Sequence, residues 1–160
     1  MVRPAEAIMS NTTTTMARHT AVGDTLPPVR RTITRESINA YRQASGDNNP
    51  IHYDDEFAAS TRFEGVIAHG MLTLALISEM MAQAYGADWL TSGNLRVRFR
   101  GAAYPGDTLE ATGAVSKCEP EGNGAKITCA VEINNAANGV RIITGTATIL
   151  AETKERGVTQ

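Results

Sequence analysis

The residues of this sequence best suited to proton transfer are Asp47 and His52, which flank the turn GDNNP. Pro50 prevents a helix from running through this stretch, and the neighbouring Gly, Asp and Asn residues favour a tight turn. Because the chain reverses there, the carboxylate and the imidazole can converge. A histidine with an ordinary pKa exchanges a proton near neutral pH, and an aspartate can position water or exchange the proton. The pair therefore predicts acid–base chemistry.

Gly70 is a candidate donor to a developing negative oxygen. Gly65 and Gly70 bracket the apolar stretch VIAH, and Gly70 then opens a long hydrophobic helix. Backbone N–H groups in the first turn of a helix have no partner within the helix, so the Gly70 N–H is available to an oxyanion. With Asp47 and His52, it supplies the groups needed for proton transfer next to a carbonyl.

Other roles are open for the same residues. An aspartate in such a turn often bonds its own backbone, and His52 and His69 could be structural histidines with satisfied hydrogen bonds. A metal site is another alternative, with Asp47, His52, Asp54 and His69 as its ligands. However, no HxxxH or CxxC spacing supports zinc, so we expect no bound metal.

The helices that must position these residues follow from the apolar pattern. Short helices are predicted at 34–45, where Thr34 can cap the first turn, and at 54–61, which begins with acidic residues. Residues 70–86 are apolar around nearly the whole helical circumference, which predicts a helix buried on most sides.

After this helix the apolar period changes to two, which predicts antiparallel strands. Apolar residues alternate with arginines in 94–100, and turn residues separate three further segments rich in Val, Ile and Thr: 108–118, 125–134 and 140–150. The segment 22–34 can add an edge strand, because its two prolines exclude it from a sheet centre. We predict an α+β architecture, in which a curved antiparallel sheet of about five strands wraps the long helix.

The 160 residues suit a single domain, with 42% hydrophobic and 20% charged residues as in globular proteins. We expect a polar, disordered segment at 1–19, one domain at 20–152 and a C-terminal tail at 153–160. The net charge of −2 gives no general reason to bind nucleic acid or an anionic membrane. No apolar run predicts a transmembrane helix or a secretory signal, so we expect a cytoplasmic protein.

Two cysteines, Cys118 and Cys129, flank the predicted hairpin loop EPEGNGA. They could face each other across two strands, at a separation that allows a disulfide in principle. In a cytoplasmic protein we expect both to be reduced.

The segment YRQASGDNNPIHYDDEFA, followed by VIAHGM, resembles the hydratase 2 motif of the MaoC-like family. That family includes the (R)-specific enoyl-CoA hydratases and the bacterial hydroxyacyl-thioester dehydratases. The strand LRVRFRGAAYPGDTL also resembles the family's strand that ends in a Pro-Gly-Asp turn, and the resemblance covers about residues 20–150. It implies a hot-dog fold, and a homodimer or a heterodimer with a related subunit.

The resemblance also implies a role for particular residues. Asp47 and His52 match the catalytic pair, and Gly70 matches the backbone donor of the oxyanion hole. Asn49 would support the geometry of the pair, and Ser78 matches a hydroxyl that helps to order the site in some relatives. The implied reaction is the reversible hydration of a trans-2-enoyl thioester to the (R)-3-hydroxyacyl thioester, without a cofactor or metal.

The substrate would be an acyl-CoA or an acyl-carrier-protein thioester, so coenzyme A enters only as part of the substrate. Its phosphates need cations, and Arg98 and Arg100 on the predicted strand 94–100 are candidates, Arg100 above all. These arginines could equally form a solvated outer face of the sheet. Met71 is a candidate for the acyl-binding wall, although apolar residues of a central helix usually fill the core.

Two other functions remain alternatives. Hot-dog proteins also include acyl-CoA thioesterases, and a fold does not determine an activity. The chain could also be a non-catalytic, acyl-binding subunit of a heterodimeric dehydratase. Such a subunit is expected to lose the acid–base pair, whereas this chain has both Asp47 and His52.

Overall fold

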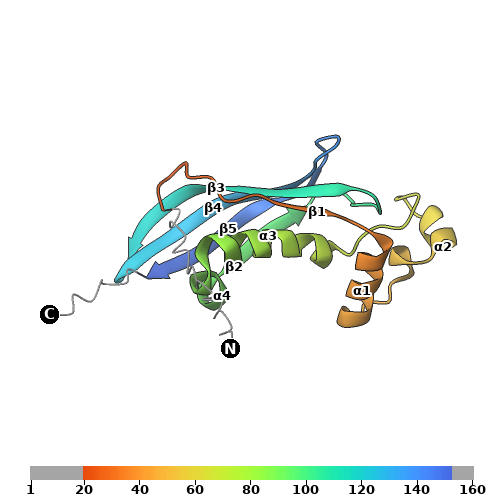
Figure 1. The fold of residues 1–160 in the computed structure, drawn as a ribbon, viewed down its shortest axis with the longest axis horizontal. Coiled ribbons are helices and arrows are strands. Elements are labelled where there is room, and N and C mark those ends of the chain that lie inside the picture. Colours follow the sequence, from red (N-terminus) through yellow and green to blue (C-terminus); the bar gives the residue numbers. More distant parts are fainter. Residues whose placement is uncertain (1–19, 153–160) are drawn as a thin grey trace, which may run out of the picture.

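The computed structural model describes residues 20–152, and the predictions for 1–19 and 153–160 lie outside this range. Within it, five strands form an antiparallel sheet in the order β1-β3-β4-β5-β2 (Figure 1). Their bounds are β1 (Val29–Thr32), β2 (Asn94–Phe99), β3 (Thr108–Glu121), β4 (Gly124–Asn135) and β5 (Arg141–Glu152). The predicted strands are confirmed, and the proline-containing segment 22–34 supplies the edge strand β1.

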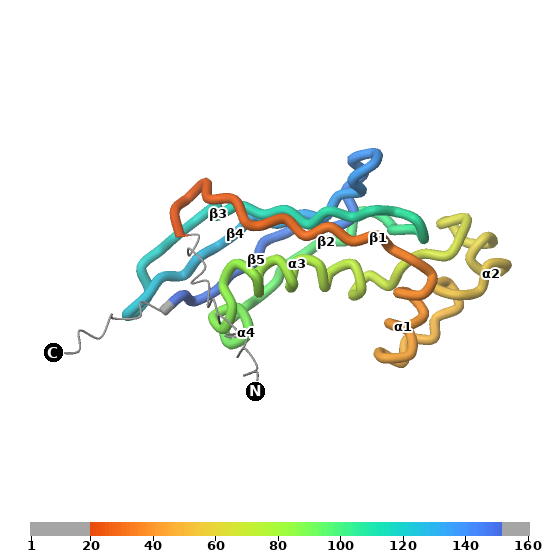
Figure 2. Tube along the Cα trace, viewed as in Figure 1, coloured from red at the N-terminus to blue at the C-terminus, as the bar shows by residue number. Residues whose placement is uncertain are grey.

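The helical elements are α1 (Arg35–Ser45), the 3-10 turn η1 (Pro50–His52), α2 (Asp55–Ala59), α3 (Gly70–Tyr85) and α4 (Ala87–Ser92). The long helix α3 lies along one face of the sheet, and α1 and α2 lie beyond its N-terminal end (Figures 1 and 2). A central helix packed on a five-stranded antiparallel sheet is the hot-dog arrangement that the resemblance implies. Among residues 20–152, no helix is long and apolar enough to cross a membrane.

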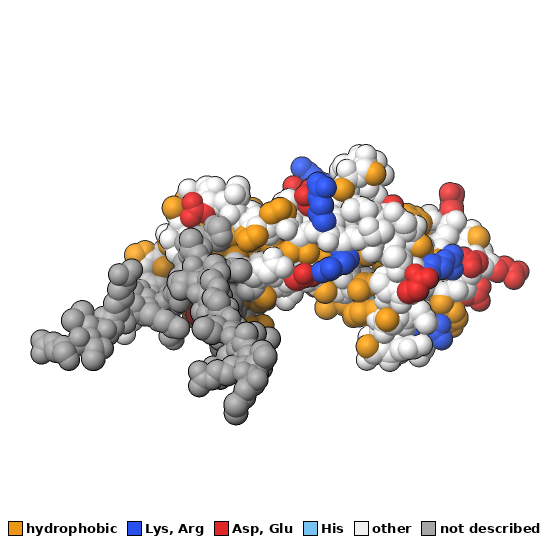
Figure 3. All heavy atoms as spheres, in the orientation of Figure 1, with side chains coloured by type: hydrophobic (Ala, Val, Ile, Leu, Met, Phe, Trp, Pro, Cys, Tyr) orange, Lys and Arg blue, Asp and Glu red, His pale blue; other side chains and the backbone are white. Residues whose placement is uncertain are grey.

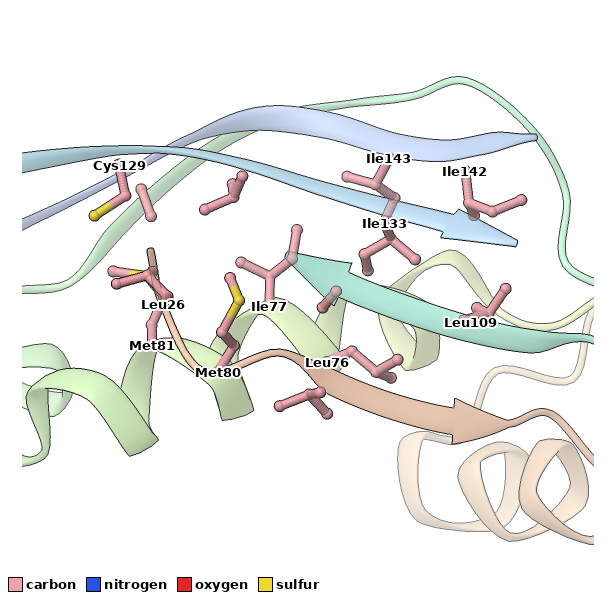
Figure 4. Packing of buried hydrophobic residues seen from close by; sticks show 14 of the residues in the cluster. Leu26, Leu76, Ile77, Met80, Met81, Leu109, Cys129, Ile133, Ile142 and Ile143 are labelled. Carbon is pink, nitrogen blue, oxygen red and sulfur yellow. The ribbon is translucent and has the colours of Figure 1, made fainter. Parts of the chain in front are cut away.

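The hydrophobic core lies between α3 and the sheet. Leu76, Ile77, Met80 and Met81 of α3 are buried and point toward sheet residues such as Ile133 (Figure 4). Burying a side chain of this size stabilises the fold by about 1.5–3 kcal/mol relative to leaving it exposed. Because α3 is packed along its length, its N-terminus is held at one end of the sheet.

Most residues of α3 are buried or partly buried, as the sequence predicts, but a strip on the side away from the sheet is exposed. Met71 is 57% exposed and Ala75 is also exposed. Figure 3 shows hydrophobic side chains along the lower margin of the molecule, on the side where α3 lies in Figure 1. The sequence pattern indicates an apolar surface around nearly the whole helix, and residues 20–152 leave the strip at Met71 and Ala75 uncovered.

Strand β2 forms the other edge of the sheet and pairs with β5. Leu95 and Val97 pack against the core, whereas the alternating Arg96 and Arg98 are exposed, as the sequence pattern predicts. Phe99 is 52% exposed although it belongs to the apolar series. An edge of this kind has unpaired backbone groups that can pair with another strand.

The two cysteines do not oppose each other. Strand β3 continues to Glu121 and β4 begins at Gly124, so the hairpin turn is shorter than expected. This tight turn places Cys118 opposite Ile127, and a register shift between Val115 and Lys117 then places Cys129 opposite Val115. Both thiols are free. The sequence does not reveal this bulge, because the extra residue belongs to a continuous strand pattern.

Candidate active site

The loop after α1 carries Asp47 and His52, and its own hydrogen bonds determine its path. Gly46 ends α1 with a left-handed φ of 74°, which residues with side chains rarely adopt. The Asp47 Oδ1 accepts a hydrogen bond from the Asn49 N–H at 3.1 Å. Asn49 Oδ1 in turn accepts from the Ile51 N–H at 3.1 Å and caps η1. Asp47 thus has the structural role of a turn residue, and Asn49 supports the turn that separates the pair.

One hydrogen bond determines which nitrogen of His52 carries its proton. His52 is half-buried, and its Nδ1 lies 2.8 Å from the Ile67 carbonyl oxygen. A carbonyl oxygen only accepts, so Nδ1 carries the proton and Nε2 of the neutral ring has a free lone pair. This is the state in which an imidazole acts as a general base.

His69 contacts both members of the pair. It is 1% exposed, and its ring stacks on the His52 ring with centroids 3.8 Å apart. Its Nε2 donates to the Asp47 carbonyl oxygen at 3.2 Å, while its Nδ1 is buried and has no hydrogen-bond partner among the described residues. Burial lowers the pKa of His69 below its ordinary value, more strongly than the bond to Asp47 raises it. His69 is therefore held neutral beside His52.

Asp47, His52 and His69 form a compact cluster. One ring nitrogen of each histidine and one carboxylate oxygen of Asp47 lie within 4.8 Å of one another. A single water molecule can bridge groups at this separation, with an ordinary hydrogen bond to each. The same groups could ligate a metal ion, but Asp54, the fourth candidate ligand, instead caps α2 by accepting from the Phe57 N–H.

Beside the cluster lies a cavity of about 350 Å³. His52 and Gly70 both line it, which brings the candidate base and the candidate oxyanion donor onto one space. Much of the remaining wall is apolar and comes from Ile67, Ala68, Phe99, Ala102, Ala103 and Ile142. The volume is at the lower end of the range for small-molecule sites.

Gly70 is the first residue of α3, so its N–H belongs to the unpaired first turn. The Thr73 hydroxyl donates to the Gly70 carbonyl at 2.7 Å and tightens this turn. A Cβ on Gly70 would lie 3.0 Å from Phe99 Cε1, closer than ordinary contact. Gly70 lines the cavity, and the absence of a side chain there leaves room for the Phe99 ring.

Five of the predicted site residues do not line this cavity: Asp47, Asn49, Met71, Ser78 and Arg98. Asp47 belongs to the cluster with His52, which does line it. Ser78 lies two turns further along α3, about 12 Å from its start at 1.5 Å per residue, and accepts a hydrogen bond from the Trp89 indole at 3.0 Å. Met71 and Arg98 are exposed and do not line the cavity. Arg100 does line it. Met71 and Arg98 point away from the cavity because a helix or strand turns neighbouring side chains in different directions, whereas Ser78 lies too far along α3.

Several residues of the site have no distinctive sequence signal. Arg62 and Phe63 follow α2 in an irregular segment, and both line the cavity. Thr73 appears in sequence as one residue of an apolar helix. The sequence offers His69 as a structural histidine or a metal ligand, but it does not indicate that the ring stacks on His52.

A family model described as "MaoC like domain" matches residues 18–139 of the chain. A 3-hydroxyacyl-thioester dehydratase Z of Mycobacterium tuberculosis is 35% identical over 113 residues, covering 66% of this chain and 75% of the relative. An (R)-specific enoyl-CoA hydratase of Rhodospirillum rubrum is 30% identical over 122 residues, covering 75% of this chain and 81% of the relative.

Among solved structures, an (R)-hydratase from Pseudomonas aeruginosa superposes with a TM-score of 0.70 at 29% identity, over 84% of this chain and 83% of that chain. Fold, sequence motif and family model agree over most of the described residues. The chain belongs to the MaoC-like family.

Proposed function

We propose that this chain catalyses the reversible hydration of trans-2-enoyl thioesters to (R)-3-hydroxyacyl thioesters. The observation that carries the proposal is a single cavity lined by His52 and by Gly70, with Asp47 in the cluster beside it. The names of the relatives, hydratase and hydroxyacyl-thioester dehydratase, support the reaction class. The (R) stereochemistry is carried over from the hydratases of R. rubrum and P. aeruginosa.

The reaction would begin with the thioester carbonyl oxygen accepting a hydrogen bond from the Gly70 N–H. Asp47 and His52 hold one water molecule, whose oxygen attacks Cβ as the pair removes a proton. The electron pair of the double bond moves toward Cα, and negative charge builds on the thioester oxygen. The N-terminus of α3 stabilises this charge. The pair then delivers a proton to Cα, which completes the addition of water without a metal or cofactor.

His69 would act as a positioning residue in this scheme. Its Nε2–H bond holds the backbone of Asp47, and its ring supports the plane of His52. Since His52 gains positive charge when it takes a proton, a charged ring stacked at 3.8 Å would oppose that step. A neutral His69 avoids this repulsion. Burial, which keeps His69 neutral, therefore helps His52 to accept a proton, just as the contacts of His69 hold His52 in place.

We also propose that two copies of the chain, or this chain and a related subunit, pair through the open surfaces. The free edge of β2 offers unpaired backbone groups, and the uncovered side of α3 offers apolar area around Met71. The heterodimer stays an alternative, because these surfaces would also fit a homologous chain. The substrate would be a thioester of coenzyme A or of an acyl carrier protein, and the cytoplasmic location stays a prediction.

The reaction class can be tested by two readouts on one sample of purified protein and crotonyl-CoA. Hydration removes the enoyl absorbance without releasing thiol, whereas a thioesterase releases coenzyme A. A panel of longer enoyl-CoA substrates and a chelator control should accompany the assay. Thiol release with an unchanged enoyl chromophore would contradict the proposal and favour the thioesterase alternative. Activity that survives chelation would agree with a metal-free mechanism.

A further inference from the structure

The cavity that holds His52 and Gly70 is also lined by two arginines, Arg62 and Arg100. They come from distant segments: Arg62 follows α2, and Arg100 follows β2. No Asp or Glu of the described chain lines the cavity. The space beside the candidate catalytic residues is therefore positively charged, although the whole chain has a net charge of −2.

Neither arginine has a carboxylate partner within residues 20–152. Other arginines do form ion pairs, such as Arg30 with Glu110 and Arg31 with Glu79, each at 2.7 Å. An unpaired guanidinium is common on a solvated surface, so the absence of partners alone would mean little. Here, however, two unpaired guanidinium groups share one acid-free cavity wall.

Local contacts hold both side chains near the cavity. The Arg100 Nε donates to the Thr144 hydroxyl at 3.1 Å, which leaves its two terminal NH2 groups available. The Arg62 guanidinium carbon lies 4.7 Å from the centre of the Phe63 ring. The Tyr104 hydroxyl donates to the Phe63 carbonyl at 2.9 Å and fixes the segment that carries Arg62. A guanidinium offers a planar set of donors that suits phosphate and carboxylate groups.

We propose that Arg62 and Arg100 bind an oxyanion carried by the thioester substrate and so select charged over uncharged substrates. The inference rests on the proposed function, because it takes the cavity to hold the thioester. The oxyanion has two sources: a phosphate on the carrier arm, or a carboxylate at the far end of the acyl chain. At about 350 Å³ the cavity is small, so a carboxylate on a short acyl chain would lie within it and a carrier phosphate at its mouth.

The test measures binding rather than turnover, with saturated thioesters that cannot be hydrated. Four ligands separate the two sources: butyryl-CoA, glutaryl-CoA, S-butyryl-N-acetylcysteamine and S-glutaryl-N-acetylcysteamine. The first carries only phosphates, the second both groups, the third neither, and the fourth only a carboxylate. Calorimetric titration of the wild-type protein, Arg62→Met and Arg100→Met gives a dissociation constant for each combination. Arg96→Met is the matched control, because Arg96 is an exposed arginine of β2 that does not line the cavity.

In Arg62→Met and in Arg100→Met, the dissociation constant should rise about tenfold for the ligands that carry the recognised oxyanion. It should stay unchanged for S-butyryl-N-acetylcysteamine. Weaker binding of butyryl-CoA would show that the arginines bind the carrier phosphate. Weaker binding of S-glutaryl-N-acetylcysteamine would show that they bind the acyl carboxylate. The proposal is overturned if the variants bind all four ligands like the wild type. It is equally overturned if they weaken the uncharged ligand as much, or if Arg96→Met has the same effect. Because no ligand reacts, a failure of the hydratase proposal would appear separately, in the absorbance assay.

Discussion

His52 presents a free ring nitrogen without any rearrangement, because its Nδ1–H is already bound to the Ile67 carbonyl at 2.8 Å. A side chain held in one tautomer and one orientation loses little freedom when it accepts a proton. His69 completes this arrangement by stacking on His52 and bonding the backbone of Asp47. The neutral, buried ring thus links the two members of the pair.

Replacing His69 should slow catalysis rather than weaken substrate binding. His69→Phe keeps a ring against His52 but loses the donor to Asp47, and small displacements of catalytic groups are costly. We expect kcat to fall about tenfold or more and KM to change little. His69→Gln, which retains an N–H donor, should recover part of the loss. Equal losses in both variants, or a change confined to KM, would contradict the positioning role.

His69 should also make the stability of the fold depend on pH. Its pKa is lowered in the folded state, so the unfolded chain takes up a proton more readily. The free energy of unfolding is therefore highest above the pKa of the unfolded histidine, about 6.5. It decreases as the pH falls below this value toward the pKa of His69 in the folded protein. Between pH 7.5 and pH 5.5, the free energy of unfolding measured with denaturant should therefore decrease more for the wild type than for His69→Gln. An identical decrease in both proteins would mean that His69 is not the source of this pH dependence.

Among the individual site residues, the sequence predicts those that a local turn brings together. Asp47 and His52 flank a proline turn, and their approach follows from local geometry. Arg62 lines the same cavity, but it lies in an irregular segment whose position depends on packing with β2 and with the residues that follow it. Such long-range proximity has no periodic pattern, so the sequence gives no sign of it.

The N-terminus of α3 is the element that would bind the substrate oxygen, and proline at Gly70 tests it. Proline is tolerated at the first position of a helix, and His69 has the extended conformation, φ −58° and ψ 135°, that a residue before proline adopts. Gly70→Pro should therefore keep the helix but lose the N–H. Gly70→Ala is the control, because both variants place a Cβ about 3.0 Å from Phe99 Cε1.

We expect Gly70→Pro to be at least about a hundredfold slower than Gly70→Ala in hydrating an enoyl thioester. Both rates should be measured on protein whose circular dichroism matches the wild type. Equal rates would mean that another group stabilises the oxygen, and the assignment of the helix terminus would be lost.

We predict that Ser78, in the second half of α3, contributes to stability through its hydrogen bond with Trp89. Ser78→Ala removes the acceptor of the buried Trp89 indole N–H, which should lower the free energy of unfolding by about 1–3 kcal/mol. The same substitution in a Trp89→Phe background should cost less, since the donor is already absent. Catalytic rates should stay at the wild-type value. A loss of activity in Ser78→Ala without a lower free energy of unfolding would instead support a role for Ser78 in the active site.

Element prediction succeeds where a long periodic pattern or a cap or turn residue marks the element, as for α1 and the five-residue α2, and it misses α4. The apolar helix and the alternating strands have patterns that extend over many residues, and each is found where expected. The six-residue helix α4 follows Gly86 directly, so its few residues carry no periodic signal. The bulge near Val115 changes the partner of Cys129, and it lies within a continuous strand pattern that gives no sign of it.

At the scale of the whole molecule, residues 20–152 leave the edge of β2 and the outer side of α3 uncovered. Exposed apolar residues of an isolated chain, such as Met71 and Phe99, often mark an interface. We therefore predict that light scattering gives twice the 17.1 kDa mass of one chain. A purely monomeric protein that is fully active would contradict this, and an inactive monomer would favour a missing related subunit.

The architecture alone does not select the reaction, since one fold supports several activities. The proposal depends on the placement of three groups: Asp47, His52 and the Gly70 N–H. The family is established over residues 18–139, and the hydratases and dehydratases among the relatives make hydration the favoured activity. The acid–base pair is therefore the point at which the proposal should be tested.

The most direct measurement is the initial rate at which crotonyl-CoA loses its enoyl absorbance with the wild type, Asp47→Asn and His52→Gln. All three proteins should unfold at similar denaturant concentrations, so that the rates can be compared. The account predicts rapid loss with the wild type and rates at least about a hundredfold lower in both variants. Near-normal rates in two correctly folded variants would contradict the assignment of Asp47 and His52 as the catalytic pair.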